Sequence, residues 1–424
     1  MGNDMPDKRP ADQAASSLPA IRVIGIGEDG IAGLGSCARA ALDCADLVAG
    51  GARHLAFLDT DPALTGKERF AWGTPFADSL EELLARREAE PARRIAILAS
   101  GDPFWHGAGG SLMQHLPIDA LTIHPAPATF SLACARLGWR LEECVTLGLH
   151  ARPIRLMRPH LHHGAKLIVL VRDGAAIAEA AALLCETGCG TSQITLLERL
   201  GGPHERIRSL RADAALPDDI ATPVALAITV EATADAALIP RAPGLPDEYF
   251  ANDGQLTKRE IRALTLSALA PQPGDLLWDI GAGAGSVAIE WCLAHPQNRA
   301  IGIEARPDRL ERAAQNALAL GVPHVDFRPG RAPDALDGLE PPDAIFIGGG
   351  ASREGVIDAA LAALKPGGRL VINAVTLETE ALLIDLHARL GGDLTRIAIS
   401  RVTPVGEMRG WRAAMPVTQW CYRR

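Results

Sequence analysis

The chain has 424 residues, more than one compact domain usually holds, so we expect two or three domains. The apolar share of 48% is enough for real cores, and the net charge of −9 argues against general nucleic-acid binding. No run approaches the roughly 18 apolar residues of a membrane span, and residues 1–19 are polar and predict a disordered tail, so a cytoplasmic enzyme is expected.

The cysteines and histidines form no pattern typical of a metal site. Eight cysteines are spread from Cys37 to Cys421, and only Cys185 and Cys189 lie close together, so we expect reduced thiols. The histidines at 160, 162 and 163 have no partner motif, which favours a solvated loop and no metal.

Apolar runs alternate with helical stretches along the chain. The runs are 21–26, 95–99, 167–171, 224–230, 276–280, 300–303, 344–347 and 369–372. This alternation favours an α/β fold with largely parallel sheets.

Residues 239–254 contain three prolines, which stop regular structure. We therefore predict a linker at 240–254 between a domain at 20–239 and a domain at 255–424. The sequence PAPAT at 125–129 interrupts the first domain, which indicates two lobes split near residue 125.

The stretch 276–294 predicts a nucleoside site. A strand at 276–280 leads into Gly281-Ala282-Gly283-Ala284-Gly285-Ser286, and a helical stretch follows. Alternate glycines let the backbone turn tightly beside a ligand, and a helix start offers free N–H groups. Asp279 disfavours a pyrophosphate there, and Ser286 breaks the dinucleotide spacing G-x-G-x-x-G.

Later strand ends add to this site. Glu304 ends the next strand and is placed to accept both ribose hydroxyls. The loop Gly330-Arg331-Ala332 is placed to frame an adenine edge, and the glycines 348–350 open a loop after the strand at 344–347. In this order the features indicate a nucleoside ligand more strongly than one glycine loop would.

The region 245–420 resembles the class I methyltransferases. The stretches 246–250, 256–262 and 278–283 resemble, more narrowly, the decarboxylating methyltransferase module of cobalamin biosynthesis. The resemblance implies a Rossmann-like fold that binds S-adenosylmethionine through its sulfonium and nucleoside groups. The implied cofactor contacts are Thr257, Asp279, Gly281, Ala282, Gly283, Gly285, Ser286, Glu304, Arg331, Ala332 and Gly349.

Near the other end, Gly25-Ile26-Gly27-Glu28-Asp29-Gly30 matches a dinucleotide pattern after a strand. Glu28 and Asp29 would repel phosphates there, because an anion site needs neutral or positive donors. We therefore favour a loop beside a substrate cleft, with an ordinary strand-to-helix turn as the alternative.

The stretches 46–50, 100–107 (SGDPFWHG), 125–131 (PAPATFS) and 149–152 resemble the tetrapyrrole methylase family over about 20–235. The sequence departs from the commoner family pattern at Trp105-His106 and at Ala126. The resemblance implies two α/β lobes with S-adenosylmethionine between them. The implied contacts are Gly101, Asp102, Phe104, Thr129, Ser131 and Ala227.

The order of the two modules resembles that of the fused precorrin C(5,15)-methyltransferases. This implies one S-adenosylmethionine site per domain and a tetrapyrrole substrate. It also implies methylation at carbon 5 by the N-terminal domain, and methylation at carbon 15 with loss of the ring C acetate carboxylate by the C-terminal domain, giving precorrin-8X. Related modules form symmetric assemblies, so a homo-oligomer is expected.

A polycarboxylate substrate needs local positive charge on an acidic protein. The candidates are Arg152, Arg155, Arg158, Lys258, Arg262, Arg409 and Arg412, for which solvated surface is an equal alternative. Trp411 and Met408 could flank the planar ring, although we expect packed positions for them. The sequence singles out no catalytic base.

Three alternatives remain open at this point. They are a class I methyltransferase acting on another acceptor such as RNA, a nicotinamide oxidoreductase built on residues 25–30, and a nucleoside sensor without catalysis. The net charge and the lack of mixed aromatic and basic stretches argue against RNA.

Overall fold

Residues 20–424 are described by the computed structural model, and they divide into two units. Among the described residues, one unit comprises 20–151, 165–178 and 191–230, and the other comprises 152–164, 179–190 and 231–424. The predicted tail at 1–19 lies outside the described residues. Among the described residues, no helix is both long and apolar enough to span a bilayer.

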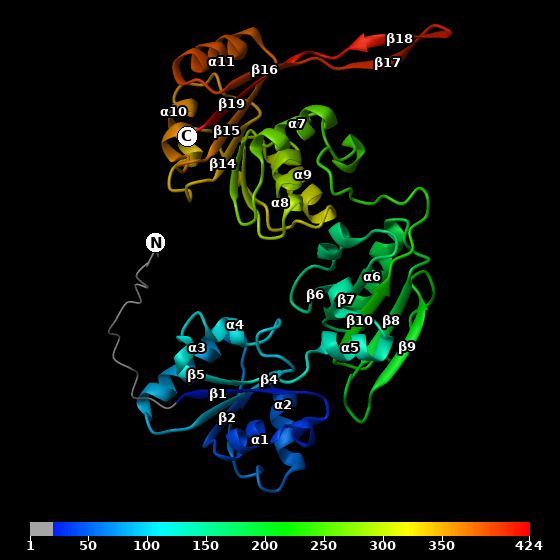
Figure 1. Cartoon of the computed structure of the whole chain (residues 1–424), viewed down its shortest axis with the longest axis vertical. Coiled ribbons are helices and arrows are strands. Elements are labelled where there is room, and N and C mark those ends of the chain that lie inside the picture. Colours follow the sequence, from blue (N-terminus) through cyan, green and yellow to red (C-terminus); the bar gives the residue numbers. More distant parts are fainter. Residues whose placement is uncertain (1–19) are drawn as a thin grey trace, which may run out of the picture. The chain divides into compact units, whose positions relative to one another are not determined.

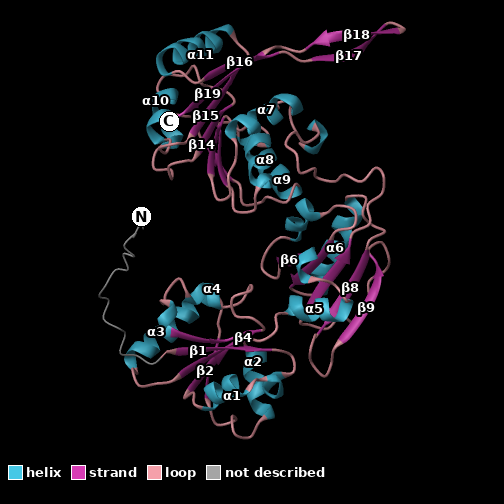
Figure 2. Ribbon diagram, in the orientation of Figure 1, coloured by secondary structure: helices cyan, strands magenta, loops and turns pink. Residues whose placement is uncertain are grey.

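The first sheet is entirely parallel (Figures 1 and 2). Its spatial order is β3 (Glu68–Ala71), β2 (Leu47–Gly50), β4 (Ile95–Ser100), β1 (Ile21–Ile26) and β5 (Leu121–His124). Its helices are α1 (Ser36–Asp43), α2 (Ala52–Ala56), α3 (Phe76–Ala89) and α4 (Gly109–Leu112). Along β1, Ile21 and Val23 enter one core while Ile24 and Ile26 enter the other, so both faces are covered.

The second sheet corrects the expectation of largely parallel sheets. Its order is β6 (Cys144–Gly148), β7 (Lys166–Val171), β10 (Val224–Thr229), β8 (Gln193–Glu198) and β9 (Arg206–Arg211). Only β6 and β7 pair in parallel, and the other three pairs are antiparallel. A buried strand gives the same apolar run in either pairing, so the sequence pattern did not separate the two. The helices here are α5 (Thr129–Leu137) and α6 (Gly174–Glu186).

The third sheet is the Rossmann-like, doubly wound element. Its order is β13 (Asp326–Pro329), β12 (Arg299–Glu304), β11 (Leu276–Ile280), β14 (Ala344–Ile347), β15 (Arg369–Ala374), β19 (Val417–Arg423) and β16 (Asp393–Ile397). The first five strands are parallel, and β19 pairs antiparallel with both β15 and β16.

Helices cover both faces of this sheet. They are α7 (Arg259–Leu269), α8 (Ser286–Ala294), α9 (Pro307–Ala319), α10 (Val356–Ala363) and α11 (Leu377–Leu390). Along β11, Trp278 lies in a core with α10 and α11, whereas Leu277 lies in a core with α7, α8 and α9. In such a sheet the ligand site lies at the carboxyl ends of the strands.

Short 3₁₀ turns connect these elements. They are η1 (Gly30–Gly33), η2 (Phe57–Thr60), η3 (Ile118–Ala120), η4 (Leu141–Glu143), η5 (Ile154–His160), η6 (Asp247–Tyr249) and η7 (Asp334–Leu336).

The segment predicted as a linker, 240–254, is packed against the C-terminal domain at three of its residues, Gly244, Leu245 and Phe250, and is mostly exposed elsewhere. Leu245 and Phe250 are buried in the core that contains α7 and α8. The amides of Gly244 and Leu245 both donate to the carboxylate of Glu290 in α8, at 2.6 and 2.9 Å. The packed part of the C-terminal domain therefore begins near Gly244.

A two-stranded ribbon, β17 (Ser400–Val405) and β18 (Met408–Ala413), extends from the third sheet (Figure 1). Trp411 and Met408 on this ribbon are each 76% exposed, so our expectation of packed positions for them is wrong. A two-stranded ribbon has no core of its own in which to bury large side chains.

Candidate functional site

The glycine loop, residues 281–286, is held rigidly at the carboxyl end of β11. The amides of Gly281 and Ala282 both donate to the carbonyl oxygen of Ile303, at 2.9 and 3.0 Å. Gly281 has a φ of +77°, and a Cβ there would lie 3.1 Å from the carbonyl oxygen of Gly349. The loop therefore needs glycine both for its conformation and for the close approach of the next loop.

Asp279 lies beneath this loop and is almost fully buried. One carboxylate oxygen accepts a hydrogen bond from the amide of Ala288 at 3.1 Å, and Oδ1 has no partner among the described residues. Burial raises the pKa of Asp279 to about 7, the Ala288 amide opposes this, and the charge of Glu304 adds to it. A cationic ligand group beside Asp279 would give its unpartnered oxygen a donor and would stabilise the charged form of the carboxylate.

Glu304, at the end of β12, holds the glycine loop from the side. Its two carboxylate oxygens accept the amides of Gly283 and Arg306, both at 2.9 Å. Each oxygen has a second acceptor position, so both can also take a hydroxyl hydrogen. The buried carboxylate is therefore fixed in orientation and retains acceptor capacity for a diol.

Glu304 and the first residue of the glycine loop border a cavity of about 210 Å³ at the carboxyl edge of the third sheet. Of the predicted residues, it is lined by Gly281, Glu304, Arg331, Ala332 and Gly349. Asp279, Gly283 and Gly285 are not part of its lining, and a Cβ on Gly285 would lie 2.6 Å from the ring of Phe327. The prediction missed Arg353, which lines the cavity just past the glycines of 348–350.

The other predicted contacts lie close to this loop. Ser286 is the first residue of α8 and is buried. The carbonyl oxygen of Thr257 accepts a hydrogen bond from Arg262 at 2.5 Å. Gln255, two residues before Thr257, has its carbonyl oxygen 3.7 Å from a Cβ placed on Gly283. Together with the two acids, this cradle fits the nucleoside and the cationic end of S-adenosylmethionine.

A second cavity, of about 250 Å³, lies in the other unit. It is lined by residues that follow β1 and β4, by the start of α5 and by ends of β7, β8 and β10. Gly27, Glu28, Gly101 and Thr129 are among the lining residues. The position of Gly25 shows why three loops meet here, since a Cβ on it would lie 2.1 Å from the Gly101 oxygen and 2.6 Å from the Ala126 amide. Ile26, Gly27 and Glu28 of the loop at 25–30 line this cavity, and its use by a substrate stays a prediction.

A chain of polar side chains lines this second cavity or lies just behind its wall. Glu28 forms an ion pair with Arg53, and Arg53 donates to the Ser100 hydroxyl at 3.0 Å. The ring of His54 lies 2.9 Å from the same hydroxyl, and burial lowers the pKa of His54 to about 4. Arg53 and His54 were not among the predicted site residues, although both lie within four residues of the carboxyl end of β2, where a ligand site is expected.

The N-terminal candidates lie at different distances from this cavity. Gly101 and Thr129 line it, whereas Asp102 turns its carboxylate to the Phe104 amide at 2.8 Å. Phe104 and Ser131 are exposed. Ala227 is buried in the core of the second sheet, and its neighbours Val224 and Ala225 reach the cavity.

Most of the cations that we predicted to bind substrate carboxylates lie near acceptor groups of the protein itself. Arg155 pairs with Glu186 at 2.8 Å, and Arg158 donates to the carbonyl oxygen of Ala237 at 3.1 Å. Lys258 lies 3.7 Å from Asp247. The exposed members of the set are Arg152, Lys258, Arg409 and Arg412.

Arg262 is a structural residue, which corrects its prediction as a substrate anchor. Its side chain is fully buried and pairs with Glu290 at 2.5 Å. It also donates to the carbonyl oxygens of Leu245 and Thr257. A guanidinium with all of these partners inside the protein has no face left for a substrate carboxylate.

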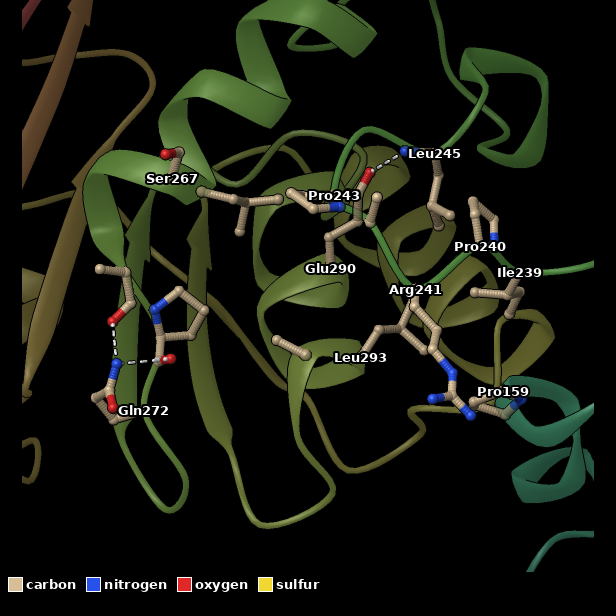
Figure 3. A pocket seen from close by; sticks show the side chains of 15 residues that line it. Pro159, Ile239, Pro240, Arg241, Pro243, Leu245, Ser267, Gln272, Glu290 and Leu293 are labelled. Carbon is tan, nitrogen blue, oxygen red and sulfur yellow. Dashed lines mark hydrogen bonds between the residues drawn. The ribbon is translucent and has the colours of Figure 1, made fainter.

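A larger cavity, of about 360 Å³, contains none of the predicted site residues (Figure 3). It is lined mainly by prolines and aliphatic side chains of 239–245 and of helices α7 and α8. Its one carboxylate, on Glu290, already accepts from Gly244, Leu245 and Arg262. The other polar side chains that line it are Arg241, Ser267 and Gln272, and none of them is a carboxylate that could pair with a cationic ligand. The two smaller cavities lie at the ends of parallel strands, where a ligand site is expected, so they are the better candidates.

Across residues 20–424, no three His, Cys, Asp or Glu side chains gather in a way that could hold a metal ion.

The chain matches two family models. Residues 20–215 match the tetrapyrrole (corrin/porphyrin) methylases, and residues 248–424 match the precorrin methyltransferase domain. A precorrin-6Y C(5,15)-methyltransferase (decarboxylating) from Sinorhizobium sp is 48% identical over 406 residues, covering 96% of this chain and 97% of that protein.

Shorter relatives match part of the chain. A cobalt-precorrin-6B C(15)-methyltransferase (decarboxylating) from Salmonella typhimurium is 34% identical over 179 residues, which is 41% of this chain and 92% of that protein. The C-terminal domain of precorrin-6Y C5,15-methyltransferase from Rhodobacter capsulatus has a solved structure that is 51% identical. It covers 44% of this chain and all of that domain, with a TM-score of 0.42.

Proposed function

This chain belongs to the precorrin-6Y C(5,15)-methyltransferase (decarboxylating) family, and from that premise we propose how its two domains divide the work. The family's reaction is methylation of precorrin-6Y at carbons 5 and 15 with decarboxylation, in cobalamin biosynthesis. The N-terminal domain methylates carbon 5. The C-terminal domain methylates carbon 15 and releases the ring C acetate carboxylate as carbon dioxide, and the product is precorrin-8X.

The observation that carries this proposal is the presence of two separate cavities, one in each unit. One lies beyond the carboxyl ends of β11 and β12, and the other lies beyond the carboxyl ends of β1 and β4. Each domain therefore has a place for one S-adenosylmethionine. The shorter relative, named for carbon 15 and decarboxylation only, supports placing those two steps in a single domain.

S-adenosylmethionine, when bound, supplies a methyl group already activated on a sulfonium. The protein's task is to align the acceptor carbon and exclude water. In the C-terminal domain, Glu304 holds the ribose hydroxyls and Asp279 faces the cationic amino-acid end. The Gly330–Ala332 loop lies beside the adenine, and Gly281 and Gly349 leave the backbone bare where the ligand approaches.

The acceptor carbons are meso carbons of a reduced tetrapyrrole, whose enamine-like character lets them attack without a strong base. Loss of carbon dioxide leaves an electron pair that a conjugated ring imine accepts, so the substrate is its own electron sink. The carboxylate that leaves is best placed away from cations, while exposed arginines such as Arg409 and Arg412 hold other acid groups of the substrate.

In the N-terminal domain, Gly101 and Thr129 border the cofactor cavity, and the Glu28–Arg53 pair presents a fixed polar wall to it. The same wall disfavours a dinucleotide, because Glu28 stands where a pyrophosphate would need donors. An RNA acceptor is also disfavoured, since the chain is acidic.

The same proposal includes a homo-oligomer. The support is the β17–β18 ribbon, where Val402, Val405, Met408 and Trp411 are all more than half exposed and both strand edges are open to a second copy. Light scattering tests this, and a monomer at micromolar concentration would reject it.

Full-length variants that block one cavity at a time test the division of labour. Gly101→Val and Gly281→Val each place a side chain where φ is positive and a carbonyl oxygen lies about 3 Å away. Given precorrin-6Y and methyl-labelled cofactor, Gly101→Val should give a once-methylated, decarboxylated product. Gly281→Val should give a once-methylated product that retains its carboxylate, by mass spectrometry.

Matched controls carry the same backbone strain away from the cavities. They are Gly138→Val and Gly367→Val, where φ is also positive and no atom lies within 4 Å of the added Cβ. Both controls should make the complete product. If carbon dioxide release survives in Gly281→Val and disappears in Gly101→Val, the assignment is reversed.

A further inference from the structure

The segment 251–257, between η6 and α7, has neither helix nor strand and lies against the glycine loop. Its own turn is set by side chains. Asn252 Oδ1 accepts the Gly254 amide at 3.0 Å, and Asp253 Oδ1 accepts the Gln255 amide at 3.2 Å. The carbonyl oxygen of Gln255 then faces Gly283. We call this segment the strap.

The start of the strap is fixed by one buried amide. Asn316 in α9 is 4% exposed, and its Oδ1 accepts the Ala251 amide at 2.9 Å. Its Nδ2 donates to the carbonyl oxygens of Ala251 and Ala284, both at 3.0 Å. A single side chain thus binds the strap, the glycine loop and α9 to one another.

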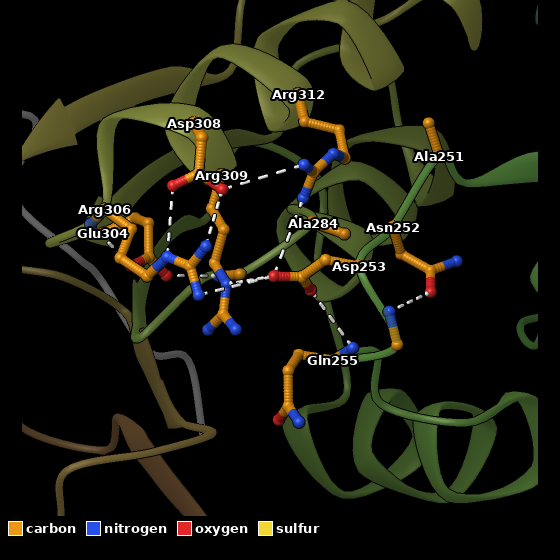
Figure 4. A network of polar contacts seen from close by, with 12 residues as sticks. Ala251, Asn252, Asp253, Gln255, Ala284, Glu304, Arg306, Asp308, Arg309 and Arg312 are labelled. Atoms are coloured by element: carbon orange, nitrogen blue, oxygen red, sulfur yellow. Dashed lines mark hydrogen bonds and ion pairs between the residues drawn. The ribbon is translucent and has the colours of Figure 1, made fainter.

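The middle of the strap is held by charge (Figure 4). Asp253 pairs with Arg309 at 2.9 Å and lies 3.6 Å from Arg306 and 3.9 Å from Arg312, all near the start of α9. The side chains of Asp253, Arg309 and Arg312 are 21–24% exposed, so water and salt reach this cluster. The Arg309 hydrogen bond, opposed by a little burial, lowers the pKa of Asp253, which keeps it charged at neutral pH.

These contacts form a closed circuit around the cofactor cradle. The backbone of Arg306 holds Glu304, and Glu304 holds Gly283. The side chain of Arg306 reaches Asp253, whose neighbour Gln255 lies against Gly283 again. A shift of the strap would therefore change the positions of both Glu304 and the glycine loop, the two parts of the site that we assign to the methyl donor.

We infer that the strap closes the methyl-donor site of the C-terminal domain, and that Asn316 and Asp253 are its positioning residues. This rests on the proposed function of that site. The two attachments differ in strength, because a buried, fully paired amide is costly to break whereas an exposed ion pair contributes little and is screened by salt. The strap is hinged at Ala251 by Asn316 and released at Asp253 to admit the ligand.

The test uses the full chain and follows carbon dioxide release, which reports the C-terminal domain alone. Asp253→Asn should raise the KM for S-adenosylmethionine about two- to fivefold with kcat unchanged, as expected from losing an exposed ion pair. The wild-type KM should rise with added salt, and the variant's should not. Hydrogen exchange of amides 251–257 should be faster in the variant.

Asp326→Asn is the matched control, because Asp326 also pairs with an arginine, Arg328 at 2.8 Å, away from the strap. It should leave KM and its salt dependence unchanged. Asn316→Ala should raise KM by about tenfold or more and also lower the melting temperature. If Asn316→Ala does not fold, Asp253→Asn still decides the matter.

The inference fails if Asp253→Asn matches the control in KM, salt dependence and exchange while the wild type releases carbon dioxide normally. If the wild-type protein neither binds S-adenosylmethionine at this site nor releases carbon dioxide, the proposed function fails instead, and the two failures are distinguishable.

Discussion

Asp279 couples the C-terminal site to pH. Its pKa of about 7 means that the carboxyl group is largely protonated below neutral pH in the ligand-free protein. A cationic ligand group beside it favours the charged form, so binding S-adenosylmethionine releases a proton. We expect the Kd to fall by up to about tenfold per pH unit from pH 5 to 7 and to level off above.

Calorimetry on the Gly101→Val background, which leaves the C-terminal site only, measures this Kd. Asp279→Asn should bind more weakly at pH 8 and lose the pH dependence. A wild-type Kd that is flat from pH 5 to 8 would contradict the assignment of Asp279 to the cationic end of the ligand.

Asp279 affects folding stability in the opposite direction: ligand binding strengthens as the pH rises, whereas the stability of the ligand-free protein falls. The pKa is raised on folding, so the folded state holds the proton more tightly, and stability is lost as pH rises from about 4 to about 7. That loss is on the order of 2–4 kcal/mol. This loss of stability should be absent in Asp279→Asn, which supplies an independent check on the raised pKa of Asp279.

Arg262 is predicted to matter for folding and not for substrate. Arg262→Met leaves Glu290 as a buried carboxylate without its cation, although the amides of Gly244 and Leu245 remain. We expect a loss of roughly 3–5 kcal/mol in the free energy of unfolding, measured in urea. Arg262→Met with Glu290→Gln should recover part of it.

If Arg262 instead binds substrate, Arg262→Met should raise the KM for the tetrapyrrole and leave the free energy of unfolding unchanged. The exposed cation Arg412 provides the contrast, since Arg412→Met should leave the unfolding free energy within about 0.5 kcal/mol.

At the scale of the element, the strands were readable because each is an apolar run bounded by loop residues, as β1 and β11 illustrate. The glycine loop was readable because its conformation needs glycine at 281, 283 and 285, all of which have positive φ. These are local requirements, and a sequence records local requirements directly.

The pairing of strands in the second sheet, and the burial of single side chains such as Arg262, could not be predicted from the sequence in the same way. The antiparallel arrangement of β7, β10 and β8 depends on which strands meet, and their apolar runs resemble those of parallel strands. The burial of Arg262 depends on Glu290, 28 residues away, and the exposure of Trp411 depends on the ribbon leaving the sheet. Each outcome is decided by contacts between segments distant in sequence.

At the scale of the whole molecule, the two cavities belong to separate units with separate cores. Sites without shared residues should bind independently. We therefore expect two S-adenosylmethionine molecules per wild-type chain by equilibrium dialysis, one in Gly101→Val, one in Gly281→Val and none in the double variant. A wild-type value of one would remove the second site, and loss of both sites in either single variant would show that they are coupled.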